Sequence, residues 1–204
     1  MNLHLIGDIH GMFAEYYHPI LANIGDEPSI QLGDLGVGFP DSKLPPLAAQ
    51  AKFIRGNHDN PDVCRAHPNY LGEYGYIDDW DLFYLSGAWS IDWDMRKPGV
   101  TWWWDEELSI RQLNQALDLY EKVKPSIVVS HDCPEIAKIS ILTYISGKHY
   151  FNAPTRTNQI LQAMFEIHQP SNWFFGHYHS SRRFQIHETT FRCVAEGEQT
   201  TITI

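Results

Sequence analysis

Short apolar runs that each lead into a glycine and a polar side chain place the strongest constraint on the fold of this chain. Near the start of the chain these runs cover residues 3–6, 29–32 and 51–54. Runs of this length between helix-like segments are typical of buried parallel strands. In alternating β and α units, the loops that follow the strands meet at one edge of the sheet. We therefore expect the polar residues of these loops to share one site.

The remaining segments predict a mixed α/β chain. Helical character is found in four stretches, Met12–Ile24, Leu44–Ala51, Glu106–Lys124 and Asn158–His168. Further strands are expected at residues 83–94, where a loop follows, at 126–130, at 173–175, and as antiparallel strands between 183 and 204. The expected architecture is early βαβ units, a central helix and a β-rich closure around one core. One domain covering residues 1–204 is expected.

Composition limits the classes of partner and compartment. The formal net charge of -10 disfavours binding to duplex nucleic acid, because such binding depends on Lys and Arg. No apolar run approaches the roughly 18 residues of a membrane span, and Met1 leads directly into a strand-like segment, so neither a membrane span nor secretion is expected. Three widely spaced cysteines fit a reducing compartment, and we expect a cytoplasmic protein. The oligomeric state cannot be derived from these features.

The loops after the strands carry oxygen and imidazole ligands without a thiol. The residues of this set are Asp8, His10, Asp34, Asn57, His58, Asp59, His131, His177 and His179. Imidazole suits zinc, iron and nickel, whereas carboxylate and amide oxygens suit manganese and magnesium. A mixed set predicts a pair of first-row metal ions, which is an arrangement used for displacement at phosphorus.

Each of these residues has an ordinary structural explanation when it is taken alone. A single histidine is more often a surface or core residue, and Asp or Asn after glycine is usual turn chemistry. The joint placement of the set at strand ends argues against that explanation. The histidines outside the set are assigned no role, and they are His4, His18, His67, His149, His168 and His187.

Asp132 and a run of three tryptophans each have two open interpretations. Asp132 either supports the neighbouring His131 or caps a helix. Trp102, Trp103 and Trp104 fit core packing better than the wall of a base-stacking pocket.

Five motifs, in order along the chain, resemble the signature of the calcineurin-like metallophosphoesterases. They are Gly7-Asp8-Ile9-His10-Gly11, Gly33-Asp34, Gly56-Asn57-His58-Asp59, His131 and Gly176-His177-Tyr178-His179. The resemblance implies a two-layer β-sandwich flanked by helices. It also implies an enzyme that hydrolyses a phosphate ester through in-line attack by a hydroxide that bridges two metal ions.

The same resemblance implies a distribution of ligands between the two metal ions. One ion would be held by Asp8, His10 and His179, the other by Asn57, His131 and His177, with Asp34 as the bridge. Manganese is the favoured ion, and zinc, iron, nickel and magnesium are alternatives. His58 would stabilise charge on the phosphoryl oxygens or protonate the leaving group, and Asp59 would orient the His58 imidazole.

The expected substrate contacts follow from a closer resemblance within that family. The first motif and Arg55–Asp59 resemble the branch of the Ser/Thr protein phosphatases and diadenosine tetraphosphatases. The arginine with which that branch grips phosphate after its Gly-Asp motif is missing from Gly33–Gly38. We expect Arg55 and Arg96 to replace it, because arginine holds phosphate with a bidentate fork, and we expect Asn57 to contact substrate as well. A solvated surface position is the alternative for Arg96.

The substrate is expected to be a small phosphoester or a nucleotide. A regulator of phosphoproteins that resembles the protein phosphatases is one alternative. A non-catalytic scaffold is another, because a retromer subunit keeps this fold with an eroded metal site. The complete ligand set of this chain argues against the scaffold.

Overall fold

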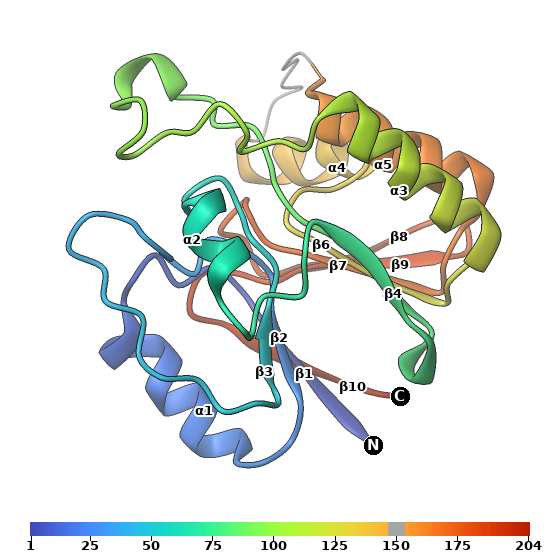
Figure 1. Ribbon diagram of the computed structural model, residues 1–204. Helices are drawn as coiled ribbons and strands as arrows, with labels where there is room; N and C mark the ends of the chain where they lie inside the picture. The colour runs from blue at the N-terminus through green and yellow to red at the C-terminus, as the bar shows by residue number, and fades with distance from the viewer. Residues whose placement is uncertain (147–153) are drawn as a thin grey trace.

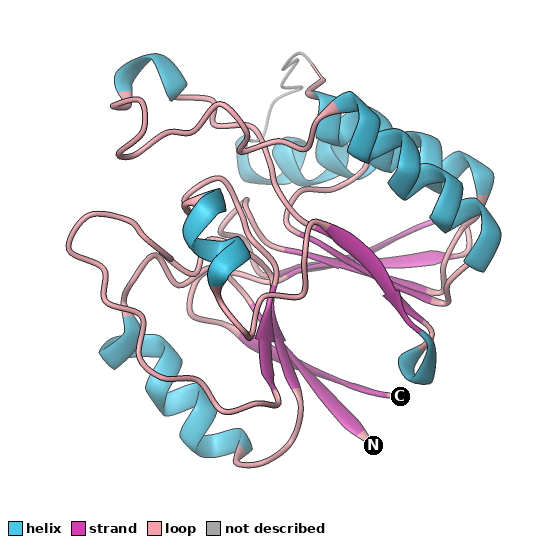
Figure 2. Ribbon diagram, viewed as in Figure 1, coloured by secondary structure: helices cyan, strands magenta, loops and turns pink. Residues whose placement is uncertain are grey.

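The computed structural model describes residues 1–146 and 154–204, in which two β-sheets lie face to face and helices cover their outer faces (Figure 1, Figure 2). The first sheet has the strand order β10-β1-β2-β3 and the second has the order β4-β5-β6-β7-β9-β8. The predicted α/β architecture of two sheets flanked by helices is confirmed. His149 lies outside the described residues, and the single domain stays a prediction.

The strands are β1 (Asn2–Ile6), β2 (Ser29–Gln31), β3 (Ala51–Phe53), β4 (Tyr74–Ile77), β5 (Leu82–Leu85), β6 (Ile127–Ser130), β7 (Asn172–Phe175), β8 (Arg182–Ile186), β9 (Thr189–Cys193) and β10 (Gln199–Thr203). The α-helices are α1 (His18–Ile24), α2 (Pro61–Ala66), α3 (Ile110–Val123), α4 (Glu135–Ser146) and α5 (Arg156–Ile167). Shorter helical segments are η1 (Phe13–Tyr17), η2 (Asp78–Trp80) and η3 (Trp93–Met95).

Parallel pairing dominates the centre of both sheets. Strands β1, β2 and β3 are parallel, and β10 joins β1 in the antiparallel direction. In the second sheet β5, β6, β7 and β9 are parallel, whereas the edge strands β4 and β8 are antiparallel to their neighbours. The loops that leave the carboxyl ends of parallel neighbours therefore lie side by side.

Alternation along the central strands divides the core between the two faces of each sheet. In β6, Val129 packs between the sheets, whereas Val128 packs against the cluster that includes residues of α3, α4 and α5. In β5, Tyr84 and Phe83 divide in the same way. Successive side chains of a strand point to opposite faces, so both faces of these strands are apolar. Polar chemistry is therefore concentrated at the strand ends.

Three of the four predicted helices are confirmed, two of them with clear amino-terminal caps. The stretch Met12–Ile24 contains η1 and α1, and the other two correspond to α3 and α5. In front of α3, Ser109 and Gln112 form a reciprocal capping box, and Thr155 and Asn158 do the same for α5. Such a box pairs two backbone N–H groups that would otherwise lack partners in the first turn.

The predicted helix at Leu44–Ala51 is wrong. Residues 42–48 are irregular, and β3 begins at Ala51. Pro45 and Pro46 explain the difference, because proline has no N–H and disfavours the helical conformation of the preceding residue. The strand expected over residues 83–94 ends at Leu85, and α2 and α4 were not predicted.

No helix among the described residues combines the length and apolarity that crossing a membrane requires.

Candidate metal centre

The predicted ligands lie in loops that follow parallel strands of both sheets. Each ligand comes after one of five strands: Asp8 and His10 after β1, Asp34 after β2, Asn57 after β3, His131 after β6, and His177 and His179 after β7. The loops after β1, β2 and β3 begin at the same edge of the first sheet, and the loops after β6 and β7 begin at the same edge of the second sheet. The structure brings all seven side chains together at this edge.

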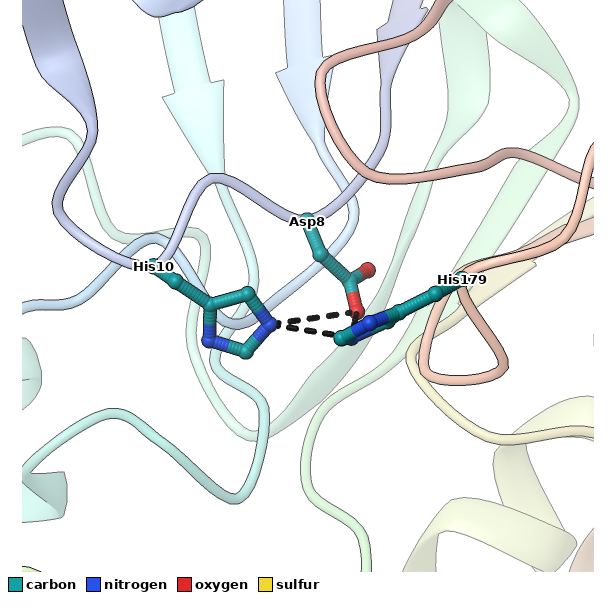
Figure 3. Close-up of side chains that lie close together, drawn as sticks. All are labelled: Asp8, His10 and His179. Atoms are coloured by element: carbon teal, nitrogen blue, oxygen red, sulfur yellow. Dashed lines mark hydrogen bonds and ion pairs between the residues drawn. The ribbon is translucent and has the colours of Figure 1, made fainter.

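One group of donors consists of Asp8, His10 and His179, whose side chains point toward one another (Figure 3). The Oδ2 atom of Asp8 lies 3.0 Å from Nε2 of His179 and 3.8 Å from Nε2 of His10. The two Nε2 atoms are 3.0 Å apart. One carboxylate oxygen and two imidazole nitrogens therefore converge, and Asp8 is fully buried.

A second group consists of Asp34, His131 and His177, with Asn57 beside it. Nε2 of His131 lies 3.4 Å from Oδ1 of Asp34 and 3.2 Å from Oδ1 of Asn57. The other carboxylate oxygen of Asp34, Oδ2, lies 3.8 Å from Nε2 of His10 in the first group. Asp34 thus presents one oxygen to each group.

Hydrogen bonds with backbone groups fix the donors. Nδ1 of His131 lies 2.8 Å from the carbonyl oxygen of Leu32, which leaves Nε2 as the nitrogen that faces the site. The backbone N–H of His177 donates to both oxygens of Asp8 at 3.1 Å. The backbone N–H of His58 donates to Oδ1 of Asp34 at 2.7 Å.

This donor set fits divalent metal ions. Carboxylate, amide and imidazole donors converge on a small volume, and the far side of His131 is hydrogen-bonded to a carbonyl as metal-binding imidazoles usually are. Such mixed oxygen and nitrogen ligands suit manganese, iron, zinc and nickel.

Unusual backbone conformations occur at four of the predicted ligands. His10, Asp34, His177 and His179 have φ angles of 51°, 57°, 67° and 47°. Positive φ is uncommon for residues other than glycine, and a strained conformation of this kind costs about 1–3 kcal/mol. Among the described residues these four are half of the eight residues other than glycine with positive φ. Their occurrence at four of the seven expected ligands indicates a constraint on where these side chains point.

The glycines of the motifs provide room for the carboxylates. A Cβ atom on Gly56 would collide with Oδ1 of Asp34, and one on Gly176 would collide with Oδ1 of Asp8. Close approach of the backbone to a ligand therefore explains why glycine precedes Asn57 and His177.

The charges of the second group are coupled. Burial opposes a charge on His131, but Asp34 and Asp8 outweigh it and raise its pKa to about 10. Burial also opposes a charge on Asp34, yet His131, His58 and His10 hold the pKa of that carboxyl well below its usual range. Without metal ions, a proton on His131 therefore balances the charge of Asp34.

Asn57 is held by a pair of buried residues from the loop between β5 and α3. Its Nδ2 donates to Oγ of Ser90 at 3.1 Å, and that hydroxyl donates to Oε2 of Glu106 at 2.6 Å. Glu106 also accepts the backbone N–H of Ser90. Because the Ser90 proton goes to Glu106, Oγ is left as an acceptor, and Oδ1 of Asn57 is directed at His131.

His58 and Arg96 lie side by side next to the metal-binding groups. Nη2 of Arg96 is 2.5 Å from Nε2 of His58, and Nε of Arg96 is 2.7 Å from Oδ1 of Asp92. Burial lowers the pKa of His58 to about 4, with Arg96 adding to the effect and Asp34 opposing it. His58 is therefore neutral near pH 7, and its Nε2 accepts a hydrogen bond from Nη2 of Arg96.

The carboxylate of Asp59 binds backbone N–H groups in place of the His58 imidazole that it was expected to orient. Asp59 is fully buried, and its carboxylate accepts the backbone N–H groups of Leu35, Gly36, Val37 and Gly56 at 2.7–3.3 Å. It therefore ties the loop after β2 to the loop after β3, which carry two ligands.

The guanidinium of Arg55 binds groups within the protein and is not free to contact a phosphate. Its side chain is fully buried, with Nε and Nη2 bonded to Oε2 of Glu73 and Nη1 bonded to the carbonyl oxygen of Glu106. The expected phosphate contact is replaced by a structural ion pair, which the sequence does not reveal because Glu73 lies in a different loop.

A pocket of about 520 Å³ opens beside the two groups, and Arg96 lies in its wall. The sequence did not identify Trp89, which lines it. Trp102 and Trp103 are buried as the packing interpretation predicts, but for Trp104 that interpretation is wrong, because its side chain is 78% exposed. Asp132 also lines the pocket and accepts a hydrogen bond from the hydroxyl of Tyr178 at 2.6 Å.

Comparison with known proteins identifies one matching family model. A model described as "Calcineurin-like phosphoesterase" matches residues 1–181. No curated protein matches this chain. Among solved structures, a conserved uncharacterized protein from Streptococcus pneumoniae TIGR4, described as a predicted phosphoesterase, shares 12% identity with a TM-score of 0.46 and covers 99% of this chain and 83% of its own. The phosphopantetheinyl hydrolase of Mycobacterium tuberculosis shares 12% identity with a TM-score of 0.46 and covers 96% and 90%.

Replacement of Asp59 tests its structural role. Asp59→Ala leaves several buried N–H groups unpaired and is expected to lower the free energy of unfolding by at least about 3 kcal/mol in urea titrations. Asp59→Asn keeps one acceptor oxygen and should lose less. The exposed Asp118→Ala on α3 is the control. Unchanged stability in Asp59→Ala, together with lost activity, would instead support a role toward His58.

The pKa of His131 predicts how metal affinity depends on pH. A metal ion must displace the proton from Nε2, and the pKa of about 10 keeps that proton in place at neutral pH. Apparent affinity should therefore rise by about tenfold per pH unit between roughly pH 6.5 and 8.5. Titration against a chromogenic chelator measures it, with His131→Gln as the control that loses this slope. A flat dependence in the parent protein would contradict the coupling of His131 to Asp34.

Proposed function

The chain belongs to the calcineurin-like phosphoesterase family, and we propose that it hydrolyses a small phosphate ester by means of two divalent metal ions. Membership of this family makes the chain a metal-dependent phosphoesterase. The observation that carries the finer proposal is the position of Asp34. Its Oδ2 faces His10 and its Oδ1 faces His131, so a single carboxylate can serve two neighbouring ions.

The ligands divide naturally between the two ions under this proposal. Asp8, His10 and His179 would hold one, Asn57, His131 and His177 would hold the other, and Asp34 would be shared. Ions bound in this way lower the pKa of water toward neutrality and neutralise charge on ester oxygens. We propose manganese, because imidazole is combined with carboxylate and amide oxygens, and zinc, iron, nickel and magnesium are alternatives.

Arg96 is proposed to bind the phosphoryl oxygens. Its Nη1 atom is buried and has no hydrogen-bond partner among the described residues. Buried donors without an acceptor are rare in folded proteins. A phosphoryl oxygen in the adjoining pocket would supply the acceptor and form a charge-assisted hydrogen bond. Asn57 lines the same pocket and remains a proposed substrate contact.

His58 is proposed to act as a neutral hydrogen-bonding group. With a pKa of about 4, only about one His58 in a thousand would carry a second proton at pH 7. Two bound cations would lower that fraction further. Of the two roles that the family resemblance leaves open, contact with the phosphoryl oxygens is therefore favoured over protonation of the leaving group.

The hydrolysis itself balances without a further reactant. Water forms a new bond to phosphorus while the bond between phosphorus and the leaving oxygen breaks. One proton from the water is finally taken up by the leaving oxygen, which departs as an alcohol. The residues of this chain would hold the ester, orient it and stabilise the negative charge of the phosphoryl oxygens.

The substrate is proposed to be a small molecule rather than a protein or a duplex. The pocket beside the donors, about 520 Å³, has the volume of a small-molecule site. A net charge of -10 opposes binding to nucleic acid. The missing arginine after Gly33-Asp34 argues against the protein phosphatase alternative, and the intact donors argue against a scaffold. A reducing compartment such as the cytoplasm is proposed, because all three cysteines are buried and free.

Replacement of the shared carboxylate tests the proposed function. Hydrolysis of chromogenic phosphomonoesters and phosphodiesters is measured with chelator-stripped protein, with manganese, nickel, zinc or magnesium added back. Asp34→Asn should lower kcat/KM by at least about 100-fold and reduce the metal content, because even indirect support of a ligand is worth that much. The exposed Asp118→Asn should behave like the parent. Full turnover in Asp34→Asn would rule out the shared carboxylate.

Two replacements of His58 distinguish hydrogen bonding from proton transfer. His58→Ala is expected to lower kcat by about 10- to 100-fold, as for loss of a hydrogen bond to a charged group. His58→Gln should retain more activity, because its amide still donates and accepts, and its pH profile should keep the parent's alkaline limb. Metal content by mass spectrometry should be unchanged in both. Equal inactivity, with the alkaline limb lost in His58→Gln, would make His58 the proton donor.

A further inference from the structure

The pocket beside the proposed metal ligands is lined by side chains of two chemical kinds. Asp34, Asn57 and His58 belong to the polar part of the lining and carry the proposed hydrolysis. The apolar part, called the apolar wall below, comes from two elements that are distant in sequence. Trp89 and Ile91 belong to the loop after β5, and Leu142 and Ile145 belong to α4.

We propose that this apolar wall binds the leaving group, and that the substrate is a phosphate ester of a flat aromatic alcohol. The inference rests on the proposed function, because the phosphoryl group is taken to lie beside Asp34, Asn57 and His58. The group attached to it must then occupy the remainder of the same pocket. Burial of an aromatic ring against an indole and aliphatic side chains is favourable because it removes apolar surface from water.

Three charged groups of the pocket lining each have a partner within the protein, and the side chains of the apolar wall offer no acceptor to the hydroxyl groups of a sugar or another polyhydroxylic leaving group. Nζ of Lys138 donates to Oδ1 of Asn158 at 2.8 Å. Oδ1 of Asp132 accepts the hydroxyl of Tyr178, and Oδ1 of Asp92 is paired with Arg96. Hydroxyl groups placed against the apolar wall would lose their hydrogen bonds to water, and each such loss is unfavourable.

Two isoleucines of α4 provide a matched pair for the test. Ile145 lines the pocket and is 51% exposed, whereas Ile139 is 50% exposed and is not part of the pocket wall. Both positions are exposed enough to accept aspartate without loss of the fold. Each replacement adds the same charge to the same helix, so only Ile145→Asp should change the apolar wall.

The experiment compares phenyl phosphate with 2-naphthyl phosphate, whose leaving groups have similar acidity. The ratio of their kcat/KM values then reports the binding of the second ring. In the parent protein with added manganese, the naphthyl ester should be favoured by about tenfold, the scale of one apolar group in a hydrophobic pocket. Ile145→Asp should bring the ratio close to one, and Ile139→Asp should leave it as in the parent. Calorimetric binding of the two matching arylphosphonates, which cannot be hydrolysed, repeats the comparison without turnover.

The outcomes separate this inference from the proposed function. Metal-dependent turnover with a ratio near one in the parent, or a preference for glycerol phosphate, would overturn the aromatic leaving group and leave the phosphoesterase intact. If no ester is hydrolysed, the proposed function fails and calorimetry decides the inference. Tighter binding of the naphthylphosphonate that is lost only in Ile145→Asp would support it, whereas equal binding of both phosphonates would overturn it.

Discussion

The carboxylate of Asp34 is the group on which the rest of the site depends. It is almost completely buried, and a buried charge is stable only when it is paired and hydrogen-bonded. The N–H of His58 contacts one of its oxygens, and its two oxygens face His131 and His10. Histidines and their protons, or metal ions in their place, must therefore surround this one residue. The raised pKa of His131 is the electrostatic consequence of that requirement.

The layered fold explains why this carboxylate is located where it is. Both faces of the central strands β5 and β6 are covered mainly with apolar side chains. Parallel pairing brings consecutive carboxyl ends to one edge. A site that combines residues from Asp8 to His179 can thus form only at that edge, and Gly56 and Gly176 allow the loops to approach closely enough.

The convergence of the seven expected ligand side chains could be predicted from the sequence, because each lies in the loop that follows a strand and within four residues of the strand end. The roles of Arg55 and Asp59 could not, because they depend on partners in other loops. Arg55 is neutralised by Glu73, and Asp59 serves backbone groups that no side-chain pattern reveals. The helix wrongly expected at Leu44–Ala51 shows the opposite case. There, Pro45 and Pro46 already argue against a helix, but the apolar pattern was given more weight than the prolines.

The loop between β5 and α3 connects the pocket to Asn57, one of the proposed metal ligands. Ser90 orients the amide of Asn57, Arg96 contacts His58, and Trp89 belongs to the pocket wall. All three residues lie within positions 89–96. Glu106, buried at the far end of the loop, fixes Ser90 through both its N–H and its hydroxyl. Trp89 directly precedes Ser90, which positions Asn57. A change that reshapes the pocket wall at Trp89 therefore also affects Ser90. Under the proposed function, substrate preference and occupancy of the metal position that includes Asn57 are consequently expected to vary together. Separate loops would not require this.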